Sequence, residues 1–276
     1  MKKIILAIAA AVICLTATAQ PLQNLKTVYK DANVTFRKLD KHTWIGSGNV
    51  MSSETMYIIE GKDKAVLIDA GTTIPNLDRI VAKITKKPVT LILTHVHPDH
   101  AGAVGCFDEV WINPADTVGI PAFMPDYKGT VRFLEHGQTF KLGGRTLETY
   151  FTPGHTPGSV TFLEVGTDHG FSGDSYGNGN LLVFDDFATL IKTCKDSYAY
   201  FSKNGYTKFY CGHYFGVNAE TLDRIKLIET MATELLNGKV DGEEIVHGMG
   251  LDRVLVRDGF RLNYTYEKLQ EERITK

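Results

Sequence analysis

The sequence is most informative where it reads Thr94-His95-Val96-His97-Pro98-Asp99-His100. This stretch directly follows the apolar run Val89–Leu93, and such a run predicts a strand buried on both faces. In an extended chain, residues two positions apart share a face, so His95 and His97 can converge on one metal ion. The end of this strand is therefore the first candidate for a metal site.

Pro98 divides the stretch into two parts. Its ring fixes its own φ and disfavours a helical conformation at the preceding residue, so the chain is expected to turn there. The turn aims Asp99 and His100 in a different direction from the two histidines before it. We therefore expect two adjacent but distinct sets of ligands.

Further motifs occur in order along the chain, and all of them follow strand-like runs or turns. They are Asp69 before Ala70-Gly71, Gly154-His155-Thr156-Pro157-Gly158, Ser172-Gly173-Asp174 and Cys211-Gly212-His213. Together with His-x-His-x-Asp-His, the series resembles the metallo-β-lactamase superfamily of hydrolases over about residues 56–213. The resemblance implies an α/β fold, a four-layer αββα sandwich of two mixed β-sheets with helices on both outer faces. It places the site at one edge, between the sheets.

The resemblance also implies a role for each candidate ligand. The first zinc ion would be held by His95, His97 and His155, the second by Asp99, His100 and His213, with Asp174 bridging the two. Neutral imidazole and carboxylate oxygen are ligands that suit zinc, and an open coordination position distinguishes a catalytic site from a structural one. We therefore expect two Zn²⁺ per chain and a metal-bridging hydroxide as the nucleophile.

Three residues close to these motifs each have two interpretations. In the family, the residue matching Asp69 orients a ligand from behind the metals, but a carboxylate that caps the following helix is an equally good description. Tyr176 follows the Asp174 loop and Tyr214 follows His213, so both could line the cleft. Ordinary packing of these two tyrosines is at least as good an interpretation.

Short β-rich runs alternate with single amphipathic helices, which indicates sheets with helices packed outside them. The helices are expected at about 74–87, 186–203 and 219–236, the last capped by Asn218. The strands are expected at 56–60, 65–69, 89–93, 109–112, 145–151, 160–164 and 208–211. Residues 20–276 are expected to form one domain, with a core over about 30–240 and a C-terminal segment 241–276. That segment ends in the alternating run Phe260–Tyr264, a strand expected to return to the main body.

The first nineteen residues have the pattern of a secretory signal peptide. Lys2 and Lys3 precede the apolar stretch Ile4–Leu15, and Ala17-Thr18-Ala19 follows it. Twelve apolar residues are too few to span a membrane, which takes about 20. We therefore expect cleavage before Gln20 and a periplasmic or secreted protein.

The composition limits what kind of protein this can be. The 276 residues are 43% hydrophobic and 22% charged, which excludes disordered, collagen-like and multi-span membrane chains. The formal charge of -2, or -4 without Lys2 and Lys3, offers no basic surface for nucleic acid. Cys106, Cys194 and Cys211 remain after cleavage, so disulfides are not expected to hold the fold together, although one bridge stays open.

The most concrete function is an exported zinc-dependent hydrolase acting on an ester, thioester, lactone or related bond of a small molecule. Asp99 would position or accept a proton in the reaction. A zinc β-lactamase would also be compatible with export, but lactamases of the family generally place a cysteine or serine near the position of Asp174. The resemblance is therefore to the glyoxalase II-like and lactonase-like hydrolases of the superfamily. A single-iron persulfide dioxygenase and a non-catalytic metal-binding module also stay open as functions.

Overall fold

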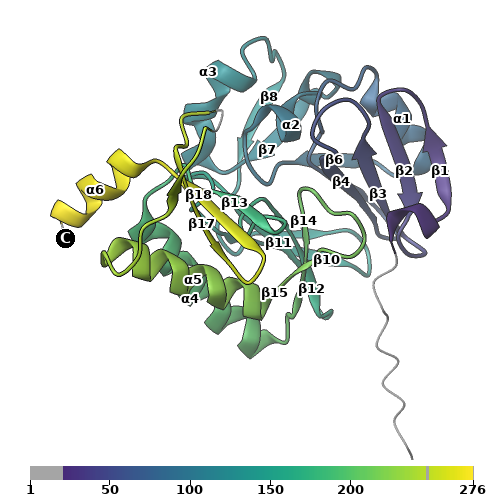
Figure 1. Ribbon diagram of the computed structural model, residues 1–276. Coiled ribbons are helices and arrows are strands. Elements are labelled where there is room, and N and C mark those ends of the chain that lie inside the picture. The colour runs from purple at the N-terminus through teal and green to yellow at the C-terminus, as the bar shows by residue number, and fades with distance from the viewer. Residues whose placement is uncertain (1–20, 247–248, 276) are drawn as a thin grey trace, which may run out of the picture.

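The computed structural model describes residues 21–246 and 249–275. Its first sheet has eight strands that lie side by side in chain order (Figure 1). They are β1 (Thr27–Lys30), β2 (Val34–Lys38), β3 (Thr43–Gly48), β4 (Thr55–Glu60), β5 (Ala65–Ile68), β6 (Val89–Ile92), β7 (Glu109–Ile112) and β8 (Thr130–Phe133). Neighbours from β1 to β5 are antiparallel, and those from β5 to β8 are parallel.

The second sheet has six strands in the order β15-β14-β12-β11-β10-β9. They are β9 (Thr139–Lys141), β10 (Thr146–Phe151), β11 (Val160–Glu164), β12 (His169–Gly173), β14 (Lys208–Cys211) and β15 (Glu220–Thr221). Strands β12 and β14 are parallel, whereas the other pairs of this sheet are antiparallel. Both sheets are therefore mixed, as expected.

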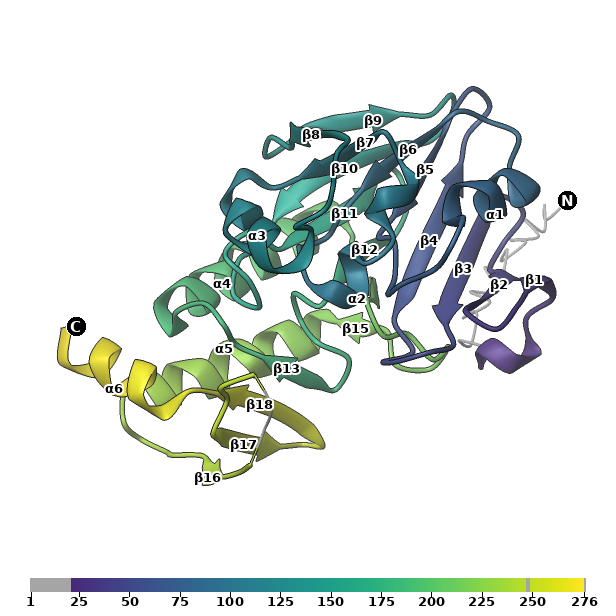
Figure 2. The same cartoon turned by 90° about the horizontal axis from the view of Figure 1, so that it is seen from above.

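Six α-helices and three short 3₁₀ helices accompany the strands in the described part of the chain. They are α1 (Leu77–Ile84), α2 (Pro98–Ala101), α3 (Ile120–Phe123), α4 (Phe187–Asn204), α5 (Leu222–Leu236) and α6 (Tyr266–Thr275), with η1 (Leu22–Asn24), η2 (Val104–Cys106) and η3 (Pro114–Gly119). Helix α1 lies against the first sheet, and α4 and α5 run together along the outer side of the second (Figures 1 and 2).

Three hydrophobic clusters show why the layers stack in this order. Alternate residues of β4 point to opposite faces: Ile58 packs under α1, whereas Tyr57 packs against Phe171 of the second sheet. On the far side of the second sheet, Leu163 and Phe209 pack against α4 and α5. The clusters thus fill the three interfaces of an αββα sandwich, and the predicted fold class is confirmed.

Two helices begin later than the sequence pattern predicts. Helix α1 starts at Leu77 because Asn76 before it has a left-handed backbone conformation, with a φ of 57°. Helix α5 starts at Leu222, since Glu220–Thr221 pair with β14 as a short strand. The Thr221 hydroxyl accepts the capping hydrogen bond, so the prediction that Asn218 caps this helix is wrong. The Asn218 side chain instead accepts a hydrogen bond from the Phe215 amide.

The C-terminal strands form a third, smaller sheet. The predicted strand Phe260–Tyr264 is present as β18, but it joins neither main sheet. It pairs with β17 (Arg253–Arg257) and, in parallel, with β13 (Asn180–Leu182), while β16 (Glu243–Glu244) completes the sheet (Figure 2). Because β13 belongs to the loop after Asp174, this sheet lies beside the candidate site.

Several expectations concern the termini and the cysteines. The predicted signal peptide 1–19 and its cleavage point before Gln20 lie outside the described residues. Within residues 21–246 and 249–275, no helix has the length and apolar character needed to cross a membrane.

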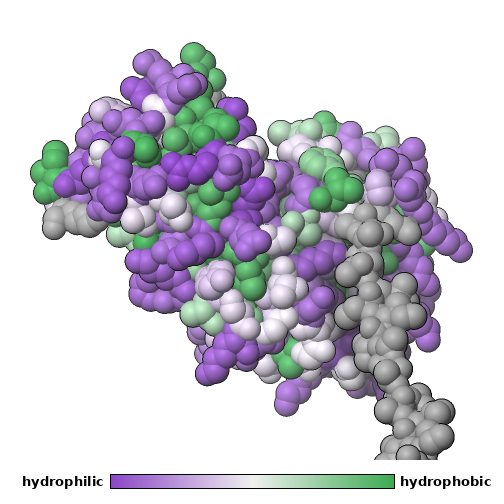
Figure 3. Space-filling view, turned by 60° about the horizontal axis from the view of Figure 1, so that its bottom comes forward, coloured by the Kyte–Doolittle hydropathy of each residue, from purple (hydrophilic) through white to green (hydrophobic). Residues whose placement is uncertain are grey.

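The face drawn in Figure 3 is mainly hydrophilic, with hydrophobic residues in separate patches. Cys106, Cys194 and Cys211 are free thiols, so the single disulfide left open by the sequence is not formed.

Candidate metal centre

Two pairs of parallel strands bring the motifs together. In the first sheet, Ile68 of β5 pairs with Ile92 of β6, so Asp69 and the stretch 94–100 both leave the same edge. In the second sheet, Gly173 of β12 pairs with Cys211 of β14, so Asp174 and His213 also leave one edge together. The carboxyl ends of parallel strands gather loop residues in this way, and the stacking of the sheets places both edges at one site.

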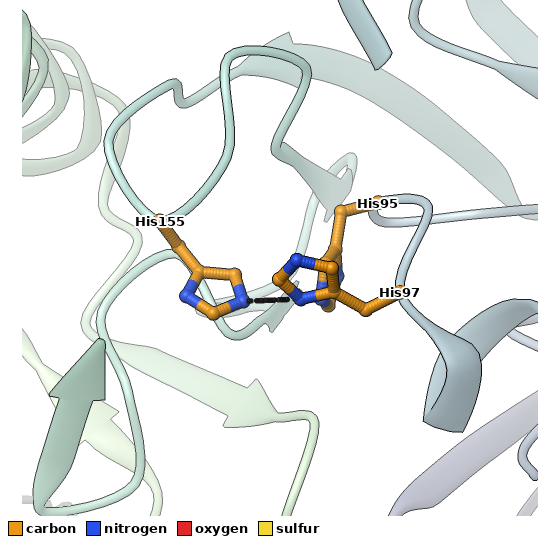
Figure 4. A group of neighbouring side chains, drawn as sticks. All are labelled: His95, His97 and His155. Carbon is orange, nitrogen blue, oxygen red and sulfur yellow. Dashed lines mark hydrogen bonds between the residues drawn. The ribbon is translucent and has the colours of Figure 1, made fainter. Parts of the chain in front are cut away.

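Three histidines form the first donor set (Figure 4). The distance from His95 Nε2 to His97 Nδ1 is 3.1 Å, and His155 Nε2 lies 3.2 Å and 3.0 Å from these two atoms. Nitrogens bound to one zinc ion at 2.0–2.1 Å in tetrahedral geometry lie roughly 3.3 Å apart. The three nitrogens thus have the spacing of ligands around a single ion.

The environment of the first set keeps its imidazoles neutral. Burial and the neighbouring histidines lower the pKa of His97 to about 3, and they also hold the pKa of His95 well below its usual range. Burial lowers the pKa of His155 as well. A metal needs the unprotonated nitrogen lone pair, so all three side chains are ready to bind one at neutral pH.

Asp99, His100 and His213 form the second donor set. His213 Nε2 lies 3.5 Å from Asp99 Oδ2, and His100 Nε2 lies 3.9 Å from Asp99 Oδ1. Burial disfavours a charged His100, but Asp69, Asp99 and Asp174 outweigh it and raise the pKa of His100 to about 10. Carboxylates that hold a proton this firmly also attract a metal cation.

The carboxylate of Asp174 lies between the two sets. Its Oδ1 is 3.7 Å from His100 Nε2, while its Oδ2 is 3.8 Å from His155 Nε2 and 3.4 Å from His213 Nε2. One carboxylate therefore reaches donors of both sets, which is the arrangement of a bridging ligand.

Two buried polar atoms at this point have no hydrogen-bond partner among the described residues, namely His100 Nε2 and Asp174 Oδ1. Leaving such a group unsatisfied costs about 1–3 kcal/mol, and more when the group is charged. Both atoms face the second donor set, where a bound cation would satisfy them. The residues present thus fit a pair of divalent metal ions.

The outer nitrogens of the histidines are already engaged. His100 Nδ1 lies 2.8 Å from Asp69 Oδ2, His155 Nδ1 lies 2.7 Å from the Leu182 carbonyl, and His213 Nδ1 lies 3.1 Å from the Ser52 carbonyl. A proton held on each Nδ1 by these oxygens leaves Nε2 free to face the site. These contacts fix both the tautomers and the ring orientations.

Asp69 lies behind His100, on the side away from the cavity-facing Nε2. Besides contacting His100, it accepts hydrogen bonds from the Thr94 amide (2.7 Å) and the Thr94 hydroxyl (2.8 Å). The following helix, α1, has Asn76 at its N-cap, so Asp69 does not cap it. Asp69 instead joins the start of the 94–100 stretch to His100.

Sequence reasoning missed a second buried aspartate, Asp116. It accepts hydrogen bonds from the amides of Val96 (2.7 Å) and Gly158 (2.8 Å) and from the Thr156 hydroxyl (3.2 Å). It thereby ties the loop of His95 and His97 to the loop of His155. Its own segment carries no motif, so nothing local in the sequence marked it.

The two tyrosines do not line the cleft. Tyr176 is fully buried in the cluster under α4, where its hydroxyl donates to Ser197 Oγ at 2.8 Å. Tyr214 is also buried, and its ring meets the Tyr210 ring edge-on at 5.1 Å between centroids. Both are therefore packing residues.

A cavity of about 360 Å³ opens at the donor sets. It is reached by five of the seven candidate ligands, namely His97, Asp99, His155, Asp174 and His213. Its other walls come from the loop before β4, from the start of α2, from the segment around β13 and from the C-terminal segment. These walls are formed by Met51, Ser52, Pro98, Asn178, Asn180, Leu182, Phe184 and Met249.

Comparison with known proteins places this geometry in a family. The model of the metallo-beta-lactamase superfamily matches residues 52–231. The chain is 29% identical to the hydroxyacylglutathione hydrolase GloC of Haemophilus influenzae, over 50% of this chain and 75% of that protein. It is 24% identical to the human acyl-coenzyme A thioesterase MBLAC2, over 62% of this chain and 76% of that protein.

Other similarities are more partial. The chain is 32% identical to the lactamase-like protein aptB of Emericella nidulans, but it spans only 45% of that protein. The crystal structure of a metallo beta lactamase from Erythrobacter litoralis superposes with a TM-score of 0.57 at 19% identity, covering 75% of this chain and 99% of that one. That likeness concerns the fold alone. With the family match spanning more than half of the sequence and including all seven candidate ligands, the chain belongs to the metallo-beta-lactamase superfamily.

Proposed function

We propose that this protein is an exported, zinc-dependent hydrolase that cleaves an ester, thioester or lactone bond of a small molecule. The observation that carries the proposal is the convergence of two donor sets with the Asp174 carboxylate between them. A structural zinc site is usually closed by four ligands, whereas these sets border an open cavity. Two of the relatives are by name a hydrolase and a thioesterase, which supports a hydrolytic reaction.

Two bound zinc ions would supply an activated water molecule near neutral pH and would polarise the carbonyl oxygen of the substrate. The side chains of this chain would orient the reactants around them. Asp99 has one oxygen toward His213 and accepts a hydrogen bond from Ser52 Oγ at 3.0 Å. Burial would raise the pKa of Asp99, but His100 and His213 keep it lowered, so Asp99 is ionised and can accept a proton.

The cavity wall holds the substrate near these groups. Phe184 lies edge-on to His97, with 5.3 Å between ring centroids, and it also borders His155. Asn180 also lines the cavity, and the side chain of the buried Asn263 donates a hydrogen bond to its carboxamide oxygen at 2.7 Å. The third sheet thus gives the site a fixed wall and keeps bulk water from one side of the reacting bond.

The decisive test is metal analysis joined to a substrate panel. We expect close to two zinc ions per purified chain, and hydrolysis that is lost on chelation and restored by zinc. The panel should contain thioesters, lactones, β-lactams and phosphodiesters, so that a β-lactamase or a nuclease is also detected. One ion per chain, or iron alone, would contradict the two-zinc site and favour a persulfide dioxygenase.

Export is a separate part of the proposal and needs its own test. Expression of the full sequence in a bacterium should give a periplasmic or secreted protein that begins at Gln20. A variant lacking residues 2–19 should stay in the cytosol and serves as the control. A full-length chain that still begins at Met1 in the cytosolic fraction would contradict export without affecting the proposed chemistry.

A further inference from the structure

The wall of the cavity differs in character from the donor sets. Beyond the candidate ligands, its apolar members come from four separate segments: Met51, then Pro98, then Leu182 and Phe184, then Met249. Its polar members, Ser52, Asn178 and Asn180, are all uncharged. Among the described residues that line the cavity, the only carboxylates are Asp99 and Asp174, and there is no lysine or arginine.

A nearby lysine has its ammonium group engaged elsewhere. Lys268 Nζ donates to the backbone carbonyl of Phe184 at 2.8 Å, and Lys268 is not among the cavity-lining residues. Asn180 lines the cavity with a neutral amide, whose oxygen accepts a hydrogen bond from Asn263. The wall formed by the described residues therefore offers hydrogen bonds and apolar surface, and no lysine or arginine.

This composition has a consequence for charged substrates. A carboxylate or phosphate loses hydration when it enters a cavity, and it binds well only if a cation or several donors replace the lost water. Two metal ions would attract an anion next to the reacting bond, but not one several bonds away against this wall. An apolar group in the same place gains from burial, about three- to fourfold in affinity for each added methylene.

We infer that the substrate is an uncharged acyl compound with an apolar group, and not a thioester of an anionic carrier such as glutathione or coenzyme A. The inference rests on the proposed hydrolase function and specifies the class of substrate for that same site. Hydrolysis of a neutral thioester would break the acyl carbon–sulfur bond, with the oxygen of water added to the acyl carbon and one proton passing to the thiolate. No oxidant or second substrate is needed.

The test compares thioesters that share one acyl group but differ in the charge of the thiol. For S-hexanoyl-N-acetylcysteamine, kcat/KM should exceed that for S-hexanoylglutathione at least tenfold, mainly through a lower KM. A second comparison charges the acyl side: the 5-carboxypentanoyl thioester of N-acetylcysteamine should be at least tenfold poorer than the hexanoyl one. Equal or better hydrolysis of the anionic member of both pairs would overturn the inference.

A variant with an added cation makes the test specific to the wall. Leu182→Lys places an ammonium group in the cavity and should reduce the preference for the neutral thioesters at least fivefold. Val256→Lys is the matched control, because Val256 lies in the same small sheet, is exposed and does not line the cavity. An unchanged preference in Leu182→Lys would overturn the assigned role of the wall.

Binding of thioethers, which cannot be hydrolysed, separates this inference from the proposed function. By calorimetry, S-hexyl-N-acetylcysteamine should bind the zinc-loaded protein more tightly than S-hexylglutathione. If the neutral thioether binds more tightly but no thioester is hydrolysed, the inference about the substrate is supported and the proposed hydrolase function is contradicted. Tighter binding of S-hexylglutathione, or no binding of either thioether, would overturn the inference whether or not the protein is a hydrolase.

Discussion

The two donor sets lie side by side, and each contains a buried histidine, His95 in the first and His100 in the second, yet the pKa values of their histidines are shifted in opposite directions. In the first set, burial and other histidines lower the pKa of His97 to about 3. In the second, three carboxylates raise the pKa of His100 to about 10 in spite of burial. Burial is the main cause of the low pKa in the first set, and three neighbouring carboxylates outweigh burial at His100, so local charge separates two buried histidines of this site.

The largest expected effect comes from removing the residue that belongs to both sets. Asp174→Ala should lower kcat/KM at least about a hundredfold and reduce the metal content, because one carboxylate reaches donors on both sides. Metal analysis and kinetics on the same sample measure both quantities. Asp196→Ala, which alters an exposed aspartate of α4, is the control. Unchanged metal content and turnover in Asp174→Ala would remove this residue from the site.

The next effect should fall on the second set alone. Asp69→Asn removes the charge behind His100. It should lower the affinity for the metal ion at the second set by about 10–100-fold and leave the affinity at the first set unchanged. Competition with a chelator of known affinity measures the two ions separately. An equal loss of affinity for both ions would contradict the idea that Asp69 acts through His100.

Metal affinity should also depend on pH differently at the two sets. With its pKa raised to about 10, His100 is protonated at neutral pH in the metal-free protein, so metal binding at the second set must displace a proton. Affinity there should rise up to tenfold per pH unit between pH 6 and 9. His97, with a pKa lowered to about 3, is already unprotonated, so affinity at the first set should stay flat over this range. If metal titrations gave the same pH dependence of affinity at both sets, the predicted difference between the sets would be contradicted.

The candidate ligands could be picked from the sequence far more readily than the residues that support them. His95, His97, Asp99 and His100 stand within six residues, where strand periodicity and Pro98 separate them into two sets, and the resemblance implied the role of each. Asp116 supports both histidine loops of the first set from a third segment, 20 and 42 residues away from its partners Val96 and Gly158. This supporting role depends on which distant loops come together in the fold, and that cannot be predicted from one sequence.

The dependence on distant segments also explains why Tyr176 was a candidate to line the cleft and why the third sheet was not predicted. Tyr176 is two residues after Asp174 and would share its face in an extended chain, but the backbone turns, with positive φ at Gly173 (50°) and Gly177 (72°). The turn sends Tyr176 into the core. Strand β13 has only three residues, too few for a periodic pattern, and it forms by pairing with β18 about 80 residues later.

The smallest effect concerns the support of the first set and mirrors the test on Asp69. In Asp116→Asn one of the two carboxylate oxygens is replaced by an NH₂ group, which donates and cannot accept. The side chain can then no longer accept hydrogen bonds from the amides of both Val96 and Gly158. One buried amide is then left unsatisfied, which should cost about 1–3 kcal/mol in the free energy of unfolding. Because Asp116 touches the loops and not the candidate ligands, metal affinity at the first set should fall only a few-fold, and the second set should be unaffected. Urea denaturation and chelator competition measure the two effects, and a loss confined to the second set would show that the aspartates do not support separate halves of the centre.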